Sequence, residues 1–420
     1  MITLVDRMKA ALRSPLWPFW LVVALLPFGR SSELGTLLCT LVLAADFVRR
    51  RRAWAWPRGA SLLLALLAGY FLAALASAPH SLAPGKSWGT VAALLRYLPL
   101  GVYACLVVDR ESRLAALYVA VAAVLALWVG DAWVQGFTGW SLGGPAQPDR
   151  LTGIFGASNP KFGPTLAVLS PFALWAAQRR WGRPGLAVAW LLMLGPVLLA
   201  GSRAAWLCYG LVALACAWRV APSRQRFVAY LGAAALALAL AAAVAWQTSA
   251  PFEARMARTL DALQGTRSGL DAALTGRLDI WHDSLKMIAA HPWTGVGVRA
   301  FRYAYPRFAP TQDHFLIAEP CGAGQGACHA HQIVLEILTE TGALGLVLWL
   351  VALAIAVRAW RRAGAQARER AWPVTLALGV MVFPFNTHLA FYSAWWGLLF
   401  AWLLALWCAA LKLAQQPTRE

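Results

Sequence analysis

Two histidines stand at the start of a long apolar stretch in HAHQIVLEILTETGALGL (329–346). His329 and His331 are two residues apart, so on a helix they would point in different directions. Neither an HExxH motif nor a zinc-type Cys/His spacing accompanies them, so the pattern argues against a metal site. A neutral imidazole can take a proton from a hydroxyl group, and a helix N-terminus favours the neutral ring. His331 is therefore a candidate general base, and a histidine that caps the helix is the alternative.

Basic residues beside other apolar stretches are candidates for binding an anion. Arg150 and Lys161 stand in RLTGIFGASNPKFG (150–163), and Arg203 stands in GSRAAW (201–206). An arginine costs about 3 kcal/mol at the centre of a membrane helix and less near its end. Arg203 therefore either snorkels toward lipid headgroups or binds a ligand. Because the three cations belong to consecutive segments on one side, helix packing can gather them around one multivalent anion such as a diphosphate.

Further arginines follow in TGRLDIWHDSLKMIAAHPWTGVGVRAFRYAYPRF (275–308). Arg277 stands in the first turn of a predicted amphipathic helix, which lies on the bilayer surface or packs over the helix bundle. The segment HPWTGVG (291–297) is predicted to end this helix. Arg299 and Arg302 come after its glycines, which allow the backbone to approach a ligand closely. For each of these arginines alone, a solvated surface charge is the alternative.

Four other ionisable residues have less distinctive surroundings. Arg96 interrupts an apolar stretch, so it either reaches the same anion or forms a buried structural pair. His388, in FNTHLAFYSAWW, is interpreted as structural. Glu336 and Glu340 are four residues apart on the helix after His331, and a packing role is favoured over orientation of a catalytic group.

Composition identifies the surroundings of these residues. The 420 residues are 60% hydrophobic and only 13% charged, with 23 Trp, which excludes an ordinary soluble protein. Stretches long enough to cross the hydrocarbon core predict about twelve helices. They are residues 15–29, 33–48, 60–78, 88–108, 114–136, 163–178, 184–200, 203–218, 227–247, 331–357, 373–390 and 393–412. Lys9 and Arg13 precede the first stretch, but no small-residue cleavage site ends it, so we expect an uncleaved helix.

The basic residues predict the orientation, because short loops rich in Lys and Arg stay in the cytoplasm. Alternate loops and both termini hold 23 of the 37 Lys and Arg, so both termini are predicted to be cytoplasmic. This bias and anionic lipid explain the net charge of +19 without a nucleic-acid partner. The chain then divides into membrane helices at 1–247, a loop at 248–328 on the opposite, oxidising side, and membrane helices at 329–420, in one integrated membrane domain. Cys321 and Cys328, just before His329, are predicted to form a disulfide there.

Three motifs together resemble a known family. GSRAAW, the segment from TGRLDIW to GVGVRAF, and HAHQIVLEILTETGALGL, in this order and spacing, are similar to the O-antigen ligase and O-antigen polymerase superfamily of bacterial inner-membrane glycosyltransferases. The likeness covers the twelve-helix layout and most of residues 150–346. It implies an all-α polytopic membrane protein, similar to glycosyltransferases of the GT-C type, with short amphipathic helices in one large periplasmic loop. One departure is Gln332, since members often have Asn after the second histidine.

The resemblance also implies a reaction and its residues. In the family an undecaprenyl diphosphate carries the donor glycan on the periplasmic face. The residues aligned with Arg203 and Arg277 are associated with its diphosphate, and the residue aligned with His331 is linked to catalysis. We expect inverting transfer in one displacement, without cofactor or metal, because the chain has no Asp-x-Asp pair and arginines suit phosphate oxygens. Arg150, Lys161, Arg299, Arg302, His329 and Arg96 are the predicted substrate-binding residues.

The acceptor distinguishes the candidate functions. A ligase transfers the glycan to lipid A-core, and this is the leading hypothesis because one dominant outer loop adjoins the HxH helix. An O-antigen polymerase would use another lipid-linked glycan, and a protein O-oligosaccharyltransferase would use a protein. A transporter of anionic lipid is the alternative from another class, but it would place charges near the bilayer midplane rather than toward one face.

Overall fold

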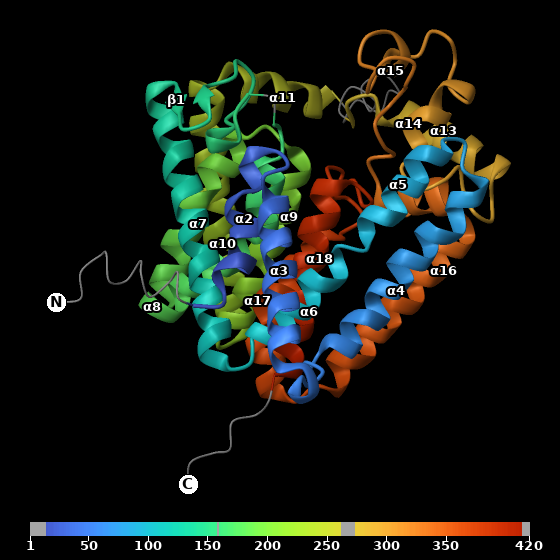
Figure 1. Cartoon of the computed structure of the whole chain (residues 1–420). Helices are drawn as coiled ribbons and strands as arrows, with labels where there is room; N and C mark the ends of the chain where they lie inside the picture. The colour runs from blue at the N-terminus through green and yellow to red at the C-terminus, as the bar shows by residue number, and fades with distance from the viewer. Residues whose placement is uncertain (1–13, 158, 262–273, 414–420) are drawn as a thin grey trace.

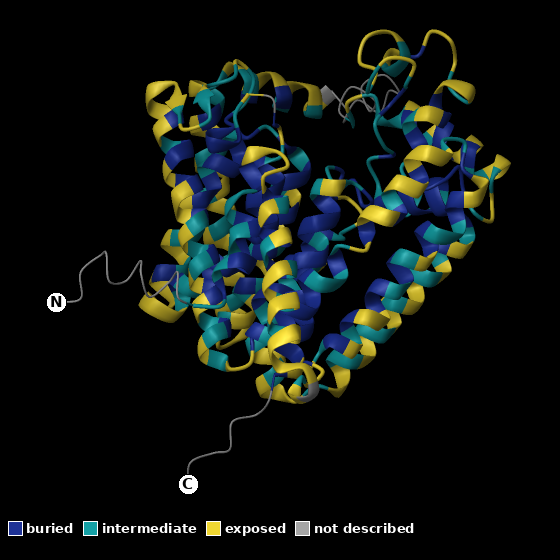
Figure 2. Cartoon of the chain, viewed as in Figure 1, coloured by how far each residue is buried: buried dark blue, intermediate teal, exposed yellow. Residues whose placement is uncertain are grey.

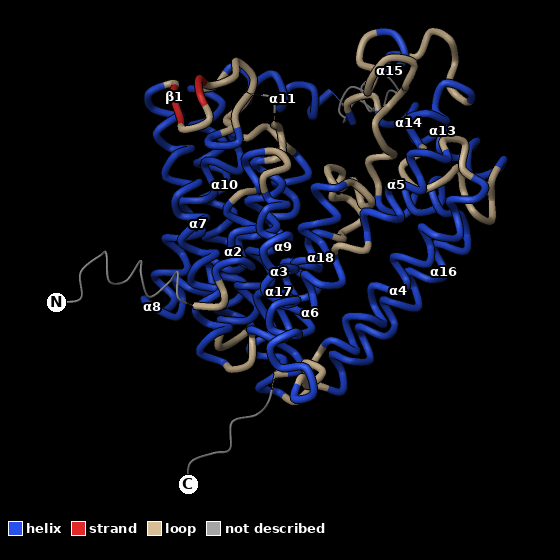
Figure 3. Tube along the Cα trace, viewed as in Figure 1, coloured by secondary structure: helices blue, strands red, loops and turns tan. Residues whose placement is uncertain are grey.

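The computed structural model describes residues 14–157, 159–261 and 274–413, and these residues are mostly helical (Figure 1; Figure 3). The only strands in these ranges are β1 (Trp140–Ser141) and β2 (Gly144–Pro145), which form an antiparallel hairpin. The helices longer than four residues are α2 (Trp17–Ala24), α3 (Ser32–Arg50), α4 (Ala60–Ser77), α5 (Pro84–Leu94), α6 (Tyr97–Val107), α7 (Glu111–Thr138), α8 (Phe162–Leu199), α9 (Arg203–Val220), α10 (Arg224–Thr248), α11 (Ala250–Asp261), α13 (Arg277–Ala290), α16 (Ile333–Arg362), α17 (Ala365–Met381) and α18 (Ala394–Lys412).

Seven helical segments of the described chain are long and apolar enough to cross a membrane. They are Ala60–His80, Pro84–Val107, Glu111–Thr138, Phe162–Leu199, Arg224–Thr248, Ile333–Arg362 and Ala394–Lys412. The predicted all-α polytopic membrane protein is therefore confirmed, whereas the count of about twelve stays a prediction. The stretch expected at 15–29 contains only the eight-residue α2 and a short 3-10 turn, which is too short to span. The residues before it, with Lys9 and Arg13, lie outside the described ranges.

Two predicted spans are joined in α8, and one is displaced. The 38 residues of α8 are interrupted at Gly182, where φ is +67°. Gly163, near the start of α8, lies against Ala200, just after its end, so the two halves fold back on each other as an antiparallel hairpin. The span expected at 373–390 is α17, which lies at Ala365–Met381. Pro384 follows, and a proline cannot continue the helix.

The helix at the centre of the bundle is α18. Nearly all of its side chains between Trp396 and Leu411 are buried, against α4, α6 and α17. At the other extreme, Ala245 is the one buried residue of α10, which lies at the periphery with exposed apolar side chains (Figure 2). An apolar helix exposed in this way fits a lipid environment.

An antiparallel pair, α4 and α16, forms one arm of the molecule (Figure 1). The two helices approach closely because Gly69 has no side chain, and a Cβ atom there would lie 2.9 Å from the Leu348 carbonyl oxygen. The α16 helix is broken at Gly342, where φ is +66°. The segment after α13 satisfies the broken ends, since the Val296 N–H donates to Thr339 O at 2.7 Å and the Ala343 N–H donates to Pro292 O at 2.8 Å. The predicted end of α13 at HPWTGVG therefore also supports α16.

Several basic segments assigned to the cytoplasm meet at one end of the bundle. Gln366 and Arg370 both donate to the Glu111 carboxylate, at 3.1 and 3.2 Å. Arg219 pairs with Glu369 at the same end. The cations with candidate functions lie toward the opposite end, where α11 and α15 (His314–Ile317) are found (Figure 1). This separation agrees with the predicted orientation, which itself stays a prediction.

Candidate functional site

A cavity of about 690 Å³ brings together residues that are far apart in the sequence. Arg150 comes from the segment between β2 and α8, Arg203 from the start of α9, Arg277 from the start of α13 and His331 from the segment before α16. Five arginines and two carboxylates of the described chain line this cavity. They are Arg150, Arg203, Arg255, Arg258 and Arg277, with Asp149 and Glu319. The lining therefore has a net charge of +3 when the histidines are neutral, which suits a multivalent anion.

Arg203 is the first residue of α9, and its backbone conformation follows from GSR. Ser202 caps the helix, with its hydroxyl accepting a hydrogen bond from the Ala205 N–H at 3.2 Å. Gly201 has a φ of +70°, which favours glycine. Residues 201–204 all line the cavity, so the positive end of α9 faces it together with the guanidinium group.

Arg277 lies close to both Arg203 and the histidine segment. Burial and then the positive charge of Arg203 lower the pKa of Arg277 to about 10, so Arg277 stays cationic at neutral pH. On the same helix, the Trp281 indole N–H donates to the Ala330 carbonyl at 3.0 Å, which ties α13 to the residue between the two histidines. The predicted amphipathic helix therefore packs against the site, which was one of the two expected placements.

His331 is held in a defined orientation by the segment between α17 and α18. Its Nδ1 atom lies 2.9 Å from the Thr387 carbonyl oxygen. A carbonyl oxygen only accepts, so Nδ1 carries the hydrogen and Nε2 is free to accept a proton. The backbone of His331 is left-handed, with a φ of +55°, which is uncommon for histidine and typical of strained functional positions. The helix cap is not His331 but Gln332, whose Oε1 accepts from the Leu335 N–H at 2.6 Å.

Burial and the charge of Arg277 lower the pKa of His331 to about 4, so the ring is neutral near pH 7. His388, interpreted as structural from the sequence, also lines the cavity beside His331. Burial and the charge of Arg277 lower its pKa to about 3. Nothing in FNTHLAFYSAWW separates this histidine from a packing residue, because its position depends on how the loop folds over α16.

Two arginines of α11 line the cavity although they were not among the predicted site residues. Arg255 is 8% exposed and donates to both the backbone carbonyl and the carboxylate of Asp149. Gly201 provides its space, since a Cβ atom there would lie 2.5 Å from the Arg255 Cζ atom. Arg258 follows one turn later and is more exposed. The available signal was their i, i+3 spacing in an outer segment that is rich in basic residues.

Two predicted substrate-binding residues lie outside the cavity. The Nζ atom of Lys161 is 3.2 Å from Asn159 Oδ1 and stacks over the Trp395 ring. Arg96 forms an ion pair with Glu33 at 2.9 Å and is not part of the cavity wall. The structure therefore shows the structural pair that was the alternative for Arg96, because α3 supplies a carboxylate to neutralise it, and the substrate-binding role of Arg96 stays a prediction.

Arg299, Arg302 and His329 form a second cluster, which adjoins His331 but does not line the cavity. The His329 ring packs on the His331 ring with 3.8 Å between centroids. The Arg299 N–H donates to Glu340 Oε2 at 2.8 Å. Burial lowers the pKa of His329 well below its usual value, and the charges of Arg299 and Arg302 contribute to this shift. None of the three lines the cavity, so their direct contact with substrate is not supported. The break in α16 explains this placement, since it brings residues 296–299 against Glu340.

Cys321 and Cys328 form a disulfide, with Cα atoms 5.0 Å apart. The five cysteines at 39, 105, 208, 216 and 408 are buried in helices. The disulfide closes the loop immediately before His329, in the segment that follows α15.

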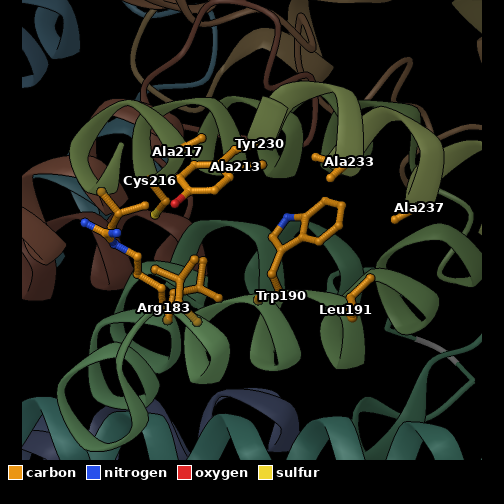
Figure 4. A pocket seen from close by; sticks show the side chains of 14 residues that line it. Arg183, Trp190, Leu191, Ala213, Cys216, Ala217, Tyr230, Ala233 and Ala237 are labelled. Atoms are coloured by element: carbon orange, nitrogen blue, oxygen red, sulfur yellow. The ribbon is translucent and has the colours of Figure 1, made fainter. Parts of the chain in front are cut away.

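A separate pocket of about 210 Å³ lies between the second half of α8, α9 and α10 (Figure 4). Trp190 and Leu191 face Ala213 and Ala233 across it, and Arg183 and Tyr230 lie at one end (Figure 4). Its lining contains neither a carboxylate nor a histidine. The pocket is therefore mostly apolar, with one cation and the Tyr230 side chain among its lining residues.

The fold and the cavity define a polytopic membrane protein with an arginine-lined cavity. Residues 188–350 match the family model described as O-antigen ligase. An O-antigen ligase of Pseudomonas aeruginosa is 33% identical over 217 residues, which are 50% of this chain and 44% of that protein. Residues 188–350 are therefore similar to the O-antigen ligase family, in agreement with the resemblance that the motifs indicated. The chain spans less than half the length of that relative. Arg203, Arg277 and His331 all lie within 188–350.

Proposed function

We propose that the protein is an O-antigen ligase, which transfers a preassembled glycan from undecaprenyl diphosphate to lipid A-core on the periplasmic face of the bacterial inner membrane. The observation that carries this proposal is the single cavity shared by Arg203, Arg277 and His331. Arginines there can bind phosphate oxygens, while the free Nε2 atom of His331 can accept a proton. The family match to residues 188–350 supports the same activity.

The reaction that we propose is one inverting displacement. His331 Nε2 removes the proton of an acceptor hydroxyl, and the oxygen forms a bond to the anomeric carbon. The bond from that carbon to the diphosphate oxygen breaks, and undecaprenyl diphosphate leaves with both electrons. Arg203 and Arg277 stabilise the charge that develops on the leaving oxygen, which is the role that a metal ion has in many other glycosyltransferases.

Donor binding is expected to make His331 a better base. Burial and then the cationic Arg277 lower the pKa of His331. A bound diphosphate would neutralise this charge and raise that pKa toward its ordinary value. The imidazole therefore becomes most basic when the leaving group is in place, which couples proton removal to the presence of donor.

An apolar groove beside the cavity is suited to the polyprenyl chain. It has a volume of about 750 Å³ and lies between α7, the second half of α8 and α10. Arg150 lines both the groove and the cavity. Its other walls are mostly apolar, with Phe137, Leu194 and Val244 among them. We therefore propose that the diphosphate lies near Arg150 while the first isoprenoid units enter this groove.

The test is ligation by the purified full-length protein in lipid nanodiscs, with a lipid-linked glycan as donor and lipid A-core as acceptor. We expect product without ATP and in the presence of a chelator, and His331→Ala is expected to abolish it. His282→Ala is the control, because His282 is exposed on α13 and lies outside the cavity lining. Full ligation by the His331 variant would remove the general-base role. If product forms only when the acceptor is another lipid-linked glycan, the protein is a polymerase.

A further inference from the structure

Asp149 occupies the place of an anion between two arginines of the cavity. Its carboxylate accepts from Arg150 Nε at 2.8 Å and from Arg255 Nη2 at 3.0 Å, and the Arg255 guanidinium also donates to its backbone carbonyl. The hydrogen bond from Arg150, followed by the charges of both arginines, lowers the pKa of Asp149, so the carboxylate is ionised. A carboxylate and a phosphate group both present anionic oxygens that accept hydrogen bonds from guanidinium groups, so the same two arginines can hold either one.

The exposure of the partners differs in a way that favours exchange. The side chain of Arg255 is 10% exposed, whereas that of Asp149 is 45% exposed. The Arg255 guanidinium packs against Gly201, and it keeps a hydrogen bond to the backbone carbonyl of Asp149 that does not depend on the Asp149 carboxylate. Asp149 can therefore leave into solvent at small cost, since a half-exposed ion pair contributes little. The guanidinium groups would stay where they are.

We propose that Asp149 is an internal placeholder that holds Arg150 and Arg255 in position in the empty cavity, and that the donor diphosphate displaces its carboxylate. This inference rests on the proposed function and adds Arg255 of α11 to the residues that bind the donor. It assigns Asp149 a competing role rather than a catalytic one. A diphosphate carries two or more negative charges, whereas the Asp149 carboxylate carries one. The two arginines therefore favour displacement of Asp149 by a diphosphate over displacement by a simple carboxylate.

Binding of inorganic pyrophosphate to the full-length protein in nanodiscs tests the inference without any glycan transfer. Asp149→Asn is expected to tighten pyrophosphate binding by about three- to tenfold, because the competing charge is removed while the side-chain shape is kept. Glu319→Gln is the matched control, since it removes the same charge from the same cavity at a side chain that is 70% exposed. We expect it to change the dissociation constant by less than about twofold.

A double-variant cycle separates displacement from a general charge effect. Asp149 competes with pyrophosphate at both Arg150 and Arg255, so the gain from Asp149→Asn is expected to shrink in the Arg255→Gln background, where only Arg150 remains. If the gain is undiminished there, or if Glu319→Gln gives the same gain, the placeholder role is wrong. Weaker binding by Asp149→Asn would also overturn it, because Asp149 would then only position the arginines. Arg255→Lys, which keeps the charge but loses the fork, serves if Arg255→Gln fails to fold, and it is expected to reduce the gain.

Failure of the proposed function has a different signature. Pyrophosphate binding that depends on Arg203 and Arg277 but not on Asp149 would overturn only the placeholder. Absence of pyrophosphate binding to the unmodified protein would overturn both the diphosphate site and the placeholder.

Discussion

The Nδ1 atom of His331 donates to the carbonyl oxygen of Thr387 across 2.9 Å, although the two residues are 56 positions apart. This hydrogen bond determines the tautomer of the histidine and directs its basic Nε2 atom away from the Thr387 backbone. Because the acceptor is a backbone carbonyl, no substitution of the Thr387 side chain removes the bond. The orientation of His331 therefore depends on the fold of the segment between α17 and α18.

Replacement of His331 by Gln is expected to lower kcat by about 10²- to 10⁴-fold, the usual contribution of a general base. The glutamine amide preserves polarity but cannot accept the proton at neutral pH. We expect KM for the donor to change little, since the arginines that bind it remain. Steady-state kinetics of the purified protein measure both constants, with His282→Gln as the exposed control on α13. An equal loss in the control would mean that the effect is not specific to the cavity.

The pH dependence of kcat/KM follows from the lowered pKa of His331. The pKa is about 4 in the free protein and 6.5 for an ordinary histidine, so the base stays neutral down to about pH 4. Activity is therefore expected to fall only as the pH drops through about 4. Arg277→Gln removes a positive charge and is expected to move this acid limb upward, toward 6.5. An acid limb already near 6.5 in the unmodified protein would contradict this prediction.

The same shift makes folding sensitive to acid. Since the pKa of His331 is lower in the folded protein than in the unfolded chain, the unfolded chain binds more protons between about pH 4 and 6.5. The free energy of unfolding is therefore expected to decrease as the pH falls through this window. Thermal denaturation in nanodiscs at several pH values measures it, and His331→Gln is expected to weaken the dependence. His388 is expected to leave a residual dependence, because its pKa is also lowered.

Gly201→Ala is expected to weaken pyrophosphate binding. A Cβ atom at residue 201 would lie 2.5 Å from the Arg255 Cζ atom, and the φ of +70° is unfavourable for alanine. We expect at least about a fivefold increase in the dissociation constant, together with about 1 kcal/mol of lost stability. Gly210→Ala on α9 is the control, because no atom lies within 4 Å of its added Cβ. Equal binding by both variants would show that the position of Arg255 does not matter for the anion.

Arg96→Gln is expected to leave pyrophosphate affinity unchanged and to reduce stability by at most about 1 kcal/mol, because Arg96 pairs with Glu33 outside the cavity. Arg203→Gln, by contrast, is expected to reduce pyrophosphate affinity by about tenfold or more. Binding and thermal denaturation of the two variants, measured side by side, check this. Reduced pyrophosphate affinity in Arg96→Gln would show that Arg96 contributes to donor binding.

Serine at both Cys321 and Cys328 is expected to lower the stability of the segment before His329 by about 2 to 3 kcal/mol, from the loss of a short closed loop. We expect residual activity at low temperature, since neither cysteine lines the cavity. Limited proteolysis of the segment, with and without reductant, measures the change. Identical cleavage in the unmodified and the serine variants would show that the disulfide does not restrain this segment.

The sequence by itself determined the environment and the class of this protein. Apolar stretches longer than a bilayer core require membrane helices whatever their packing, so the all-α polytopic fold followed from composition and length. The three motifs indicated the resemblance to the O-antigen ligase superfamily that the match over residues 188–350 supports, and Arg203, Arg277 and His331 line one cavity. Their catalytic roles stay predictions.

Only the tertiary structure decided which other ionisable residues reach that cavity. Arg96 and Arg203 both adjoin apolar stretches, but packing places Arg96 beside the carboxylate of Glu33 and places Arg203 in the cavity wall. Arg255 enters the cavity because Gly201, in the turn between α8 and α9, leaves space for its guanidinium group. Such contacts join residues that are distant in the chain, so local sequence patterns do not predict them. The physical reason is that a guanidinium group must find a partner for its charge, and the fold decides whether that partner is protein or ligand.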